Sequence, residues 1–380
     1  MLKKIILAVV LFCTEGINAQ RSITADPSAT TLTKNLFRNL QRSLPAGILF
    51  GHQDDLAYGM DWSFEPGKSC IKDAIGEYPA VYGWELGNIE LDEIYNLDSV
   101  PFDKMKQFIR DGFTRGGVIT LSWHTNHPFT GGNAWDTTSG GVAAINPGGA
   151  KHALYKSWLD KVAAFIADLK TEDGVAIPVI FRPFHELTGN WFWWCEHACT
   201  PEEFKTLWRF TFNYLTGTKQ LHHLLFAYNP DRFQTREHYL ARYPGDEYVD
   251  VMSFDMYQYG DPASSDQFEK GMNQRLEIIT QLSKEKNKIP AIAETGYLNI
   301  PYSKWFTEKL MKGIGQHQIS YILIWRDGGL ITGTNGNKFA PSQDHFIPIG
   351  SDPAFWDFQS LYKSGKFLFE KKVAALNLYR

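Results

Sequence analysis

Residues 177–186 read IPVIFRPFHE, a nearly continuous apolar run over 177–184 that ends in a polar pair. A short run of this kind is typical of a strand buried on both faces, as in a parallel sheet. We therefore predict a strand here and seven others of the same character, at 47–53, 80–86, 117–123, 224–228, 249–254, 289–293 and 319–325.

Longer amphipathic stretches lie between these runs and predict helices. Over 152–169 the apolar side chains share one stripe at helical spacing. The segment TPEE at 200–203 is typical of a helix start, with Thr200 as N-cap, proline in the first position and Glu203 three residues after the cap. Further candidate helices are 267–286, 303–313 and 354–371.

Eight strands, each followed by a helical or mixed segment, indicate an α/β fold of the (β/α)8 TIM-barrel type. An open doubly wound sheet is the competing architecture, but it would have to use eight such units without closing. No linker rich in proline, glycine and serine divides the chain. We therefore expect a single barrel domain over residues 20–380.

The first nineteen residues have the features of a signal peptide. Lysines at 3–4 form a positive start, residues 5–12 are apolar, and 18–20 offer a small-residue cleavage point. We expect an exported protein, secreted or periplasmic. A lipid anchor at Cys13 ranks second, because Phe12 is bulkier than lipoprotein signals prefer. Eight apolar residues are too few to cross a bilayer and no other long apolar run occurs, so no membrane span is expected.

The charge balance argues against one class of partner. The chain has 38 Lys and Arg against 42 Asp and Glu, a net charge of −4, and no basic run beyond the lysine pairs at 3–4 and 371–372. Electrostatically driven binding of nucleic acid is therefore not expected. Aromatic residues make up 14% of the chain, which hints at an apolar, ring-shaped ligand. Without heptads or an exposed apolar repeat, a monomer is the default expectation.

Three cysteines remain when residues 1–19 are set aside, namely Cys70, Cys195 and Cys199. An oxidising compartment permits a disulfide, and Cys195 with Cys199 is the first choice because the pair is local. Three unpaired thiols fit the same spacing, so both alternatives stay open.

Polar and aromatic residues gather where the predicted strands end. Barrel enzymes place their active sites at the carboxyl ends of the strands. Polarity at one strand end would mean little, but seven converge here. The segments are GHQDD at 51–55, WE at 84–85, WHTNHP at 123–128, RPFHE at 182–186, DMY at 255–257, ETG at 294–296 and WRD at 325–327.

Glu186 and Glu294 are the most informative of these residues. Each is a carboxylate at the end of an apolar strand, three strands apart, so the two could face each other across the barrel mouth. Two carboxyl groups about 5–5.5 Å apart can hydrolyse a glycosidic bond with retention, one as acid and one as nucleophile. The alternative is that either glutamate forms a salt bridge with Arg182 or Arg326.

Other catalytic motifs are absent, and we expect no metal and no cofactor. His185 and Glu186 lack the second histidine of a zinc protease helix, and Pro128 directly after His127 prevents His124 and His127 from sharing a helix. No nucleophile elbow, phosphate-binding loop or dinucleotide fingerprint occurs. The tryptophan cluster in WFWW at 191–194 is interpreted as a platform on which sugar rings stack.

The motifs FRPFHE at 181–186 and GNWFWW at 189–194 resemble the acid/base region of glycoside hydrolase family 26, and AETG at 293–296 resembles its nucleophile motif. The resemblance spans about residues 30–370 and includes GHQD at 51–54, WH at 123–124, DMY at 255–257 and WR at 325–326. It implies a barrel fold, a retaining mechanism and, for most members, β-1,4-mannanase activity.

The resemblance also implies roles at the reacting bond. Glu186 becomes the acid/base and Glu294 the nucleophile. His185 would steer the geometry near the nucleophile and the substrate's 2-hydroxyl group, and Tyr257 would hydrogen-bond the nucleophile.

Further roles concern the neighbouring sugars. Trp325 would stack on the sugar one site from the cleavage point, while Arg326 and His124 would hydrogen-bond the non-reducing side. Trp191 would contact the leaving-group side. The pair LT at 187–188 departs from the residues common in relatives, which affects leaving-group contacts and leaves the reaction unchanged.

The expected function is exported hydrolysis of β-1,4-mannan, galactomannan or glucomannan by double displacement, releasing manno-oligosaccharides. A β-glucanase (lichenase) or xylanase of the same mechanism is the enzyme alternative, and a non-catalytic carbohydrate-binding protein is the alternative from another class. Loops at 55–69, 129–150 and 327–353 could close one end of the cleft, which leaves endo against exo action, with mannobiose as an exo product, open.

Overall fold

The computed structural model describes residues 23–328 and 344–380. The predicted signal peptide, Cys13 and most of the predicted loop 327–353 therefore lie outside the described residues. Within the described ranges no helix is both long enough and apolar enough to cross a membrane.

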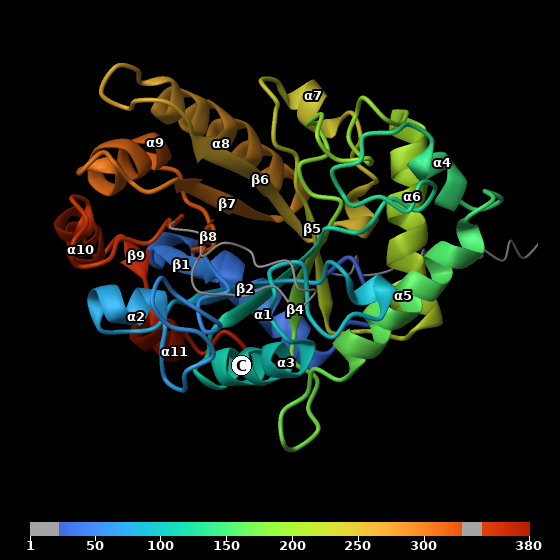
Figure 1. The fold of residues 1–380 in the computed structure, drawn as a ribbon, viewed down its shortest axis with the longest axis horizontal. Coiled ribbons are helices and arrows are strands. Elements are labelled where there is room, and N and C mark those ends of the chain that lie inside the picture. The colour runs from blue at the N-terminus through green and yellow to red at the C-terminus, as the bar shows by residue number, and fades with distance from the viewer. Residues whose placement is uncertain (1–22, 329–343) are drawn as a thin grey trace, which may run out of the picture.

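Eight parallel strands form a closed barrel, which confirms the predicted fold (Figure 1). Each strand pairs with the next along the chain, and β8 pairs with β1 to close the ring, with Leu49 opposite Tyr321. A short ninth strand, β9 (Phe367–Leu368), adds to β1. The barrel strands are β1 (Ile48–Gln53), β2 (Val81–Glu85), β3 (Val118–Trp123), β4 (Val179–Pro183), β5 (Leu224–Tyr228), β6 (Val251–Gln258), β7 (Ile289–Tyr297) and β8 (Tyr321–Ile324).

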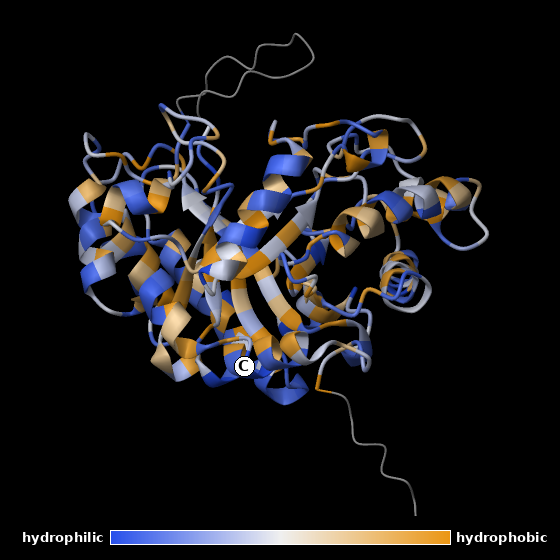
Figure 2. Ribbon diagram, turned by 90° about the horizontal axis from the view of Figure 1, so that it is seen from below, coloured by the Kyte–Doolittle hydropathy of each residue, from blue (hydrophilic) through white to orange (hydrophobic). Residues whose placement is uncertain are grey.

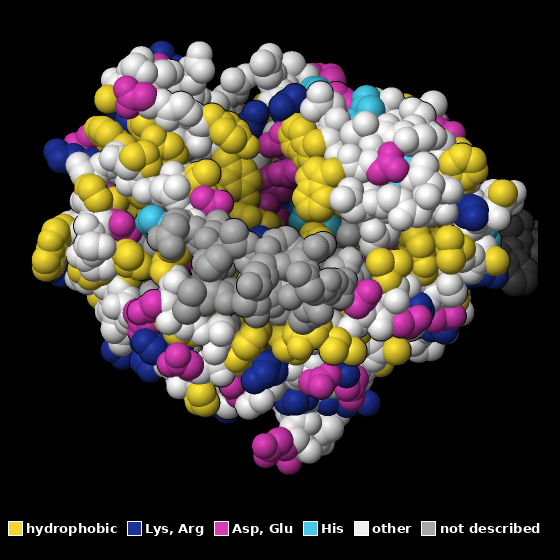
Figure 3. Space-filling model, viewed as in Figure 1, with side chains coloured by type: hydrophobic (Ala, Val, Ile, Leu, Met, Phe, Trp, Pro, Cys, Tyr) yellow, Lys and Arg dark blue, Asp and Glu magenta, His cyan; other side chains and the backbone are white. Residues whose placement is uncertain are grey.

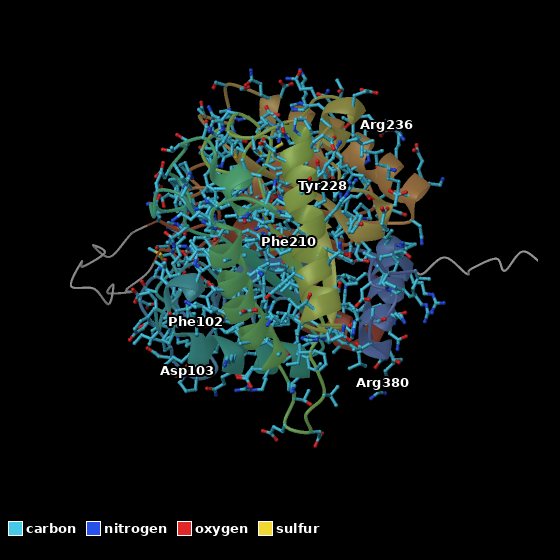
Figure 4. The ribbon with its side chains drawn as sticks, turned by 90° about the vertical axis from the view of Figure 1, so that its right-hand side faces the viewer. Phe102, Asp103, Phe210, Tyr228, Arg236 and Arg380 are labelled. Carbon is cyan, nitrogen blue, oxygen red and sulfur yellow. The ribbon has the colours of Figure 1, made fainter. Side chains whose placement is uncertain are left out.

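Helices surround this barrel; they contain many hydrophilic residues, whereas hydrophobic residues are frequent in the strands at the centre (Figure 2). They are α1 (Thr31–Arg42), α2 (Cys70–Ile75), α3 (Phe102–Thr114), α4 (Gly141–Ile145), α5 (His152–Ala167), α6 (Pro201–Asn213), α7 (Arg236–Leu240), α8 (Gln267–Lys286), α9 (Met311–Ile314), α10 (Phe355–Lys363) and α11 (Glu370–Leu376). In Figure 4, α5 and α6 run along one side, where the rings of Phe210 and His152 are 4.5 Å apart.

Two predicted helices differ from the structure. The segment predicted over 303–313 is a π-helix, η5 (Trp305–Leu310), that continues into α9. The segment predicted over 354–371 is divided into α10, β9 and α11. Gly365 has φ +73°, a conformation that ends a right-handed helix, and the chain then joins the sheet beside β1.

Helix α1 packs against the barrel interior. Leu36, Phe37 and Leu40 are buried in one cluster with side chains from the barrel strands, among them Val118 and Ile180. The amphipathic pattern of α1 explains this packing, since its buried residues recur at helical spacing. The helix contacts β5 and β7 and leaves the carboxyl ends of the strands available for a site.

Candidate active site

Three carboxylates meet at the carboxyl ends of β4, β6 and β7. One oxygen from each of Glu186, Asp255 and Glu294 lies within 4.8 Å of the others. Figure 3 shows a hollow on this face of the molecule, with acidic side chains on its floor and hydrophobic side chains along its walls. The structure thus brings together the two glutamates singled out from the sequence and adds a third acid.

Glu186 lies in the loop directly after β4. Its backbone φ is +53° and that of Phe184 is +52°, a left-handed conformation that costs non-glycine residues free energy and is common at functional sites. The backbone N–H of Glu186 donates to the Asn229 carbonyl at 2.7 Å. The Trp191 indole N–H donates to Glu186 Oε2.

The surroundings of Glu186 favour its protonated form. Burial, the negative charge of Glu294 and that of Asp231 raise the pKa of Glu186 to about 8, although the hydrogen bond from Trp191 acts in the opposite direction. A glutamate that stays protonated at neutral pH can serve as a general acid.

Glu294 lies within β7 and has partners that stabilise a negative charge. The Tyr257 hydroxyl donates to Glu294 Oε2 at 2.8 Å, and the Arg182 guanidinium pairs with Glu294 Oε1. The salt bridge weighed as an alternative to catalysis therefore exists for Glu294. It does not exclude a nucleophilic role, because a nucleophilic carboxylate must be charged and fixed in position.

Asp255 was not singled out as a site residue from the sequence. It is fully buried on β6, 2.9 Å from Arg182 Nη1, and accepts a hydrogen bond from the Asn229 amide at 2.6 Å. Burial holds the pKa of Asp255 well above its usual range, against the opposing charge of Arg182. Asp255 and Glu294 thus share one arginine, which fixes the guanidinium beside the nucleophile candidate.

Two histidines form a connected pair in the site. His124 Nδ1 lies 2.8 Å from Glu85 Oε2, and His124 Nε2 lies 3.0 Å from His185 Nε2. Burial lowers the pKa of His124, but Glu85 and other nearby carboxylates outweigh it, so the net shift is upward. Burial, Arg182 and His124 hold the pKa of His185 well below its usual range. These opposite shifts favour the protonated form of His124 and the neutral form of His185, an arrangement in which His124 Nε2 donates to His185 Nε2.

The tryptophan cluster is divided between core and site, which corrects the interpretation of WFWW as a stacking platform. Trp193 and Trp194 are fully buried, and their indole N–H groups donate to the carbonyls of Thr125 and His185. Only Trp191 is partly exposed, with the Arg232 guanidinium 4.6 Å from its ring. Buried indoles with hydrogen-bond partners are ordinary core residues, so the cluster carries less binding surface than its composition suggests.

Trp325 and Arg326 directly follow β8 in the chain. Both are partly buried, and the Trp325 ring centroid is 6.5 Å from that of His124. Arg326 Nε pairs with Asp98 Oδ1 at 2.7 Å, and Nη1 lies 3.3 Å from the Tyr58 hydroxyl. Asp98 lies in a loop between η2 (Ile89–Leu91) and α3, outside every predicted strand, so its pairing with Arg326 could not be predicted from the sequence.

His127, Cys195 and Cys199 contact backbone groups of the fold and have no assigned part in the reaction. His127 Nε2 lies 2.8 Å from the Thr138 carbonyl, and its Nδ1 accepts from the backbone N–H groups of Phe129 and Thr130 at 3.1 and 3.2 Å. The thiols of Cys195 and Cys199 are free, each directed at a backbone carbonyl. Of the two alternatives for these cysteines, the structure has the unpaired thiols.

The family model described as glycosyl hydrolase family 26 matches residues 25–329. The chain belongs to glycosyl hydrolase family 26. This membership agrees with the resemblance of the FRPFHE and AETG motifs.

Individual family 26 proteins are similar over most of this chain. A solved structure of a beta-mannanase from Bacteroides ovatus has 40% sequence identity and a TM-score of 0.85, covering 92% of this chain and 98% of that one. A modular endo-beta-1,4-mannanase from Cellulomonas fimi has 32% identity and a TM-score of 0.81, covering 92% of this chain and 78% of that one.

The curated relatives extend beyond the matched region. A mannan endo-1,4-beta-mannosidase from Bifidobacterium adolescentis is 33% identical over 296 residues, covering 75% of this chain but 29% of the relative. The chain thus spans less than a third of that protein, and it matches half of a second relative, from Caldalkalibacillus mannanilyticus.

Proposed function

We propose that this chain is an exported β-1,4-mannanase that cleaves mannan, galactomannan or glucomannan by double displacement and releases manno-oligosaccharides. The single observation that carries the reaction type is the separation of the carboxylates. Oxygens of Glu186 and Glu294 lie within 4.8 Å of each other, close to the spacing of retaining glycosidases and well short of the roughly 6.5–9.5 Å that inverting enzymes need for a water.

In the first step Glu294 attacks the anomeric carbon while Glu186 protonates the departing oxygen. The Glu294 oxygen forms a bond to the sugar, and the glycosidic bond breaks with its electron pair going to the leaving group. Arg182 pairs with Glu294 and Tyr257 donates a hydrogen bond to it, and these contacts align the carboxylate for attack. Protonated Glu186 supplies the proton that the leaving alkoxide needs.

In the second step a water molecule attacks the glycosyl-enzyme. Glu186, now ionised, accepts the proton of this water, and the bond between the sugar and Glu294 breaks. While Glu294 is bonded to the sugar it carries no negative charge, so the repulsion that raises the pKa of Glu186 is relieved and Glu186 can act as a base. When the bond to Glu294 breaks, the anion returns and again favours the protonated form of Glu186.

The substrate is proposed from the relatives, whose printed names are mannanases and mannosidases. Export is proposed from the features of residues 1–19, and the domain limits 20–380 from the continuity of the barrel. The Trp325 ring centroid is 6.5 Å from that of His124, and Arg326 follows Trp325 in the chain, which supports the proposed contacts of these three residues with the non-reducing side. The Trp191 indole N–H donates to Glu186, which supports its proposed contact with the leaving-group side.

The test is chromatography of products from linear mannan, galactomannan, cellulose, lichenan and xylan, treated in parallel. We expect manno-oligosaccharides from the mannans only, with a ladder for endo action and an early disaccharide for exo action. The Glu294→Ala variant is the control for contaminating activity. Glucose or xylose oligomers would keep the mechanism and overturn the substrate, whereas no product from any polymer would favour a carbohydrate-binding protein.

A further inference from the structure

A second group of ligand-type side chains lies beside β1, apart from the catalytic carboxylates. His52 is in β1, Asp55 follows that strand, and Cys70 is the first residue of α2. One ligand atom from each of the three lies within 4.8 Å of the others, and all three residues are buried. We propose that His52, Asp55 and Cys70 bind one zinc ion, as a structural site separate from the reaction.

The donor set is the first argument. An imidazole nitrogen, a carboxylate oxygen and a thiolate sulfur are the ligands that zinc takes in proteins, in tetrahedral geometry. His52 Nδ1 and Asp55 Oδ1 are already 3.0 Å apart, which is close to the separation of two ligands on one zinc ion. Binding releases the thiol proton of Cys70 to solvent, and the sulfur electron pair forms the bond to the metal.

An unsatisfied carboxylate oxygen is the second, independent argument. Asp55 is completely buried, and its Oδ1 faces His52 and accepts from the Ile71 backbone N–H at 3.1 Å. Its Oδ2 is buried and, within the described parts of the chain, has no hydrogen-bond partner. A buried anionic oxygen without a partner is costly, and a cation at this position would satisfy it.

The surroundings of His52 provide the third argument. His52 Nε2 lies 3.8 Å from Asp327 Oδ1. That oxygen accepts from the backbone N–H groups of Phe346 and Ile347 at 2.7 and 3.1 Å. Histidines that bind a metal through one nitrogen commonly donate from the other to a carboxylate. Asp327 is the carboxylate that faces His52 Nε2, at ion-pair distance and beyond hydrogen-bond distance. A pocket of about 190 Å³ has Cys70 and Asp327 among its lining residues, and it would give an ion a route to the Cys70 side of the site.

The proposed ion would connect three segments that the chain keeps far apart. It would link the end of β1 to the start of α2. Through the contact of His52 with Asp327 it would also help to fix the segment that contains Trp325 and Arg326. Its contribution is therefore stability and the position of the β8 end, while hydrolysis by Glu186 and Glu294 proceeds without it.

The test uses the full chain, treated with a chelator and then titrated with Zn²⁺ or Co²⁺. We expect one zinc per chain by elemental analysis, and a rise of about 5 °C or more in the midpoint of thermal unfolding on zinc addition. With Co²⁺ we expect a sulfur-to-cobalt charge-transfer band in the near ultraviolet. The Cys70→Ser variant should lose the band and the thermal shift.

A matched control removes the other thiols. The variant Cys13→Ser/Cys195→Ser/Cys199→Ser leaves Cys70 as the only cysteine of the sequence and should keep the band. This variant decides the proposal even if Cys70→Ser does not fold, because its cobalt–thiolate band can come only from Cys70. Absence of the band in this folded variant, or its survival in Cys70→Ser, would overturn the zinc site.

Discussion

Two glutamates that differ only in position have acquired opposite surroundings. Glu294 receives a guanidinium and a phenol hydroxyl, whereas within the described ranges no lysine or arginine pairs with Glu186, which receives the Trp191 indole N–H. Separating two carboxylates in this way is how one site obtains both an acid and a nucleophile near neutral pH. The different roles of Glu186 and Glu294 thus depend on the side chains that surround each one, and they could not be derived from the two residues alone.

Replacing each glutamate should separate their roles. Glu294→Ala is expected to abolish turnover of every substrate. Glu186→Ala should lower kcat on mannan about 10²–10⁴-fold, yet spare the glycosylation step for an aryl mannoside whose leaving group needs no proton. Pre-steady-state release of the aryl group measures this step. Glu196→Ala, an exposed glutamate of the same loop, is the matched control, and equal loss of glycosylation in both catalytic variants would contradict the assignment.

The raised pKa of Glu186 predicts the alkaline limb of the pH profile. The acid must be protonated to work, so kcat on mannan should fall as pH rises through about 8. The Trp191 hydrogen bond lowers this pKa, and Trp191→Phe should therefore move the limb to higher pH. Steady-state kinetics across pH provide the measurement. An activated aryl substrate, whose first step needs no acid, should lack this limb in that step; a limb that is identical for both substrates would point to another group.

At the scale of elements, the eight alternating strands and helices could be predicted because buried strands and amphipathic helices have different apolar periods. The points at which β6 and β7 end could not be predicted from these apolar patterns. We predicted strands that stop at residues 254 and 293, but β6 continues to Gln258 and β7 to Tyr297. Irregular register after Phe254 and Ile292 turns polar side chains into the site, so the apolar pattern ends before the strand does.

The residues that contact the site side chains could be predicted only in part from the sequence. The FRPFHE and AETG motifs locate Glu186 and Glu294, because these segments contain the chemistry in consecutive residues. Asp98 and Asn229 lie in loops distant in sequence from the residues they contact, and only tertiary packing brings them to Arg326 and Asp255. A single sequence has no signal for such pairings.

The start of α6 allows a test at this scale. Thr200 accepts from the Glu203 backbone N–H, and the Glu203 side chain accepts from the Thr200 backbone N–H, a complete capping box. Thr200→Ala should lower the free energy of unfolding by about 1 kcal/mol, measured by urea titration. Thr206→Ala removes an exposed hydroxyl from the middle of the same helix and should change little. If both variants lost equal stability, the cap would have no special role.

At the scale of the whole molecule, the two ends of the barrel have different tasks. Helix α1 packs its apolar face into the barrel core, while the carboxylates gather at the carboxyl ends of the strands. Such a separation lets substitutions at the closed end change stability without altering the geometry of the site.

Phe37 provides the corresponding prediction. Its side chain is 1% exposed in the core cluster, so Phe37→Ala should cost about 3–5 kcal/mol of unfolding free energy through lost burial and a cavity. Because α1 lies away from the carboxylates, kcat of the remaining folded enzyme should stay within about twofold. Denaturant titration and kinetics at low temperature test both parts. Arg38→Ala, at an exposed position of the same helix, is the control, and a large fall in kcat with Phe37→Ala would show coupling between the two ends.

The C-terminal residues are held beside α1. The Asn39 amide donates to the carbonyl of Arg380 at 2.8 Å, and the Asn35 amide to that of Tyr379 at 3.2 Å. Anything fused or tethered at Arg380 therefore emerges on the side of the closed barrel end. An enzyme immobilised on a bead through this point would present its open mouth to the surrounding liquid, where a long, insoluble polysaccharide could approach it without meeting the support.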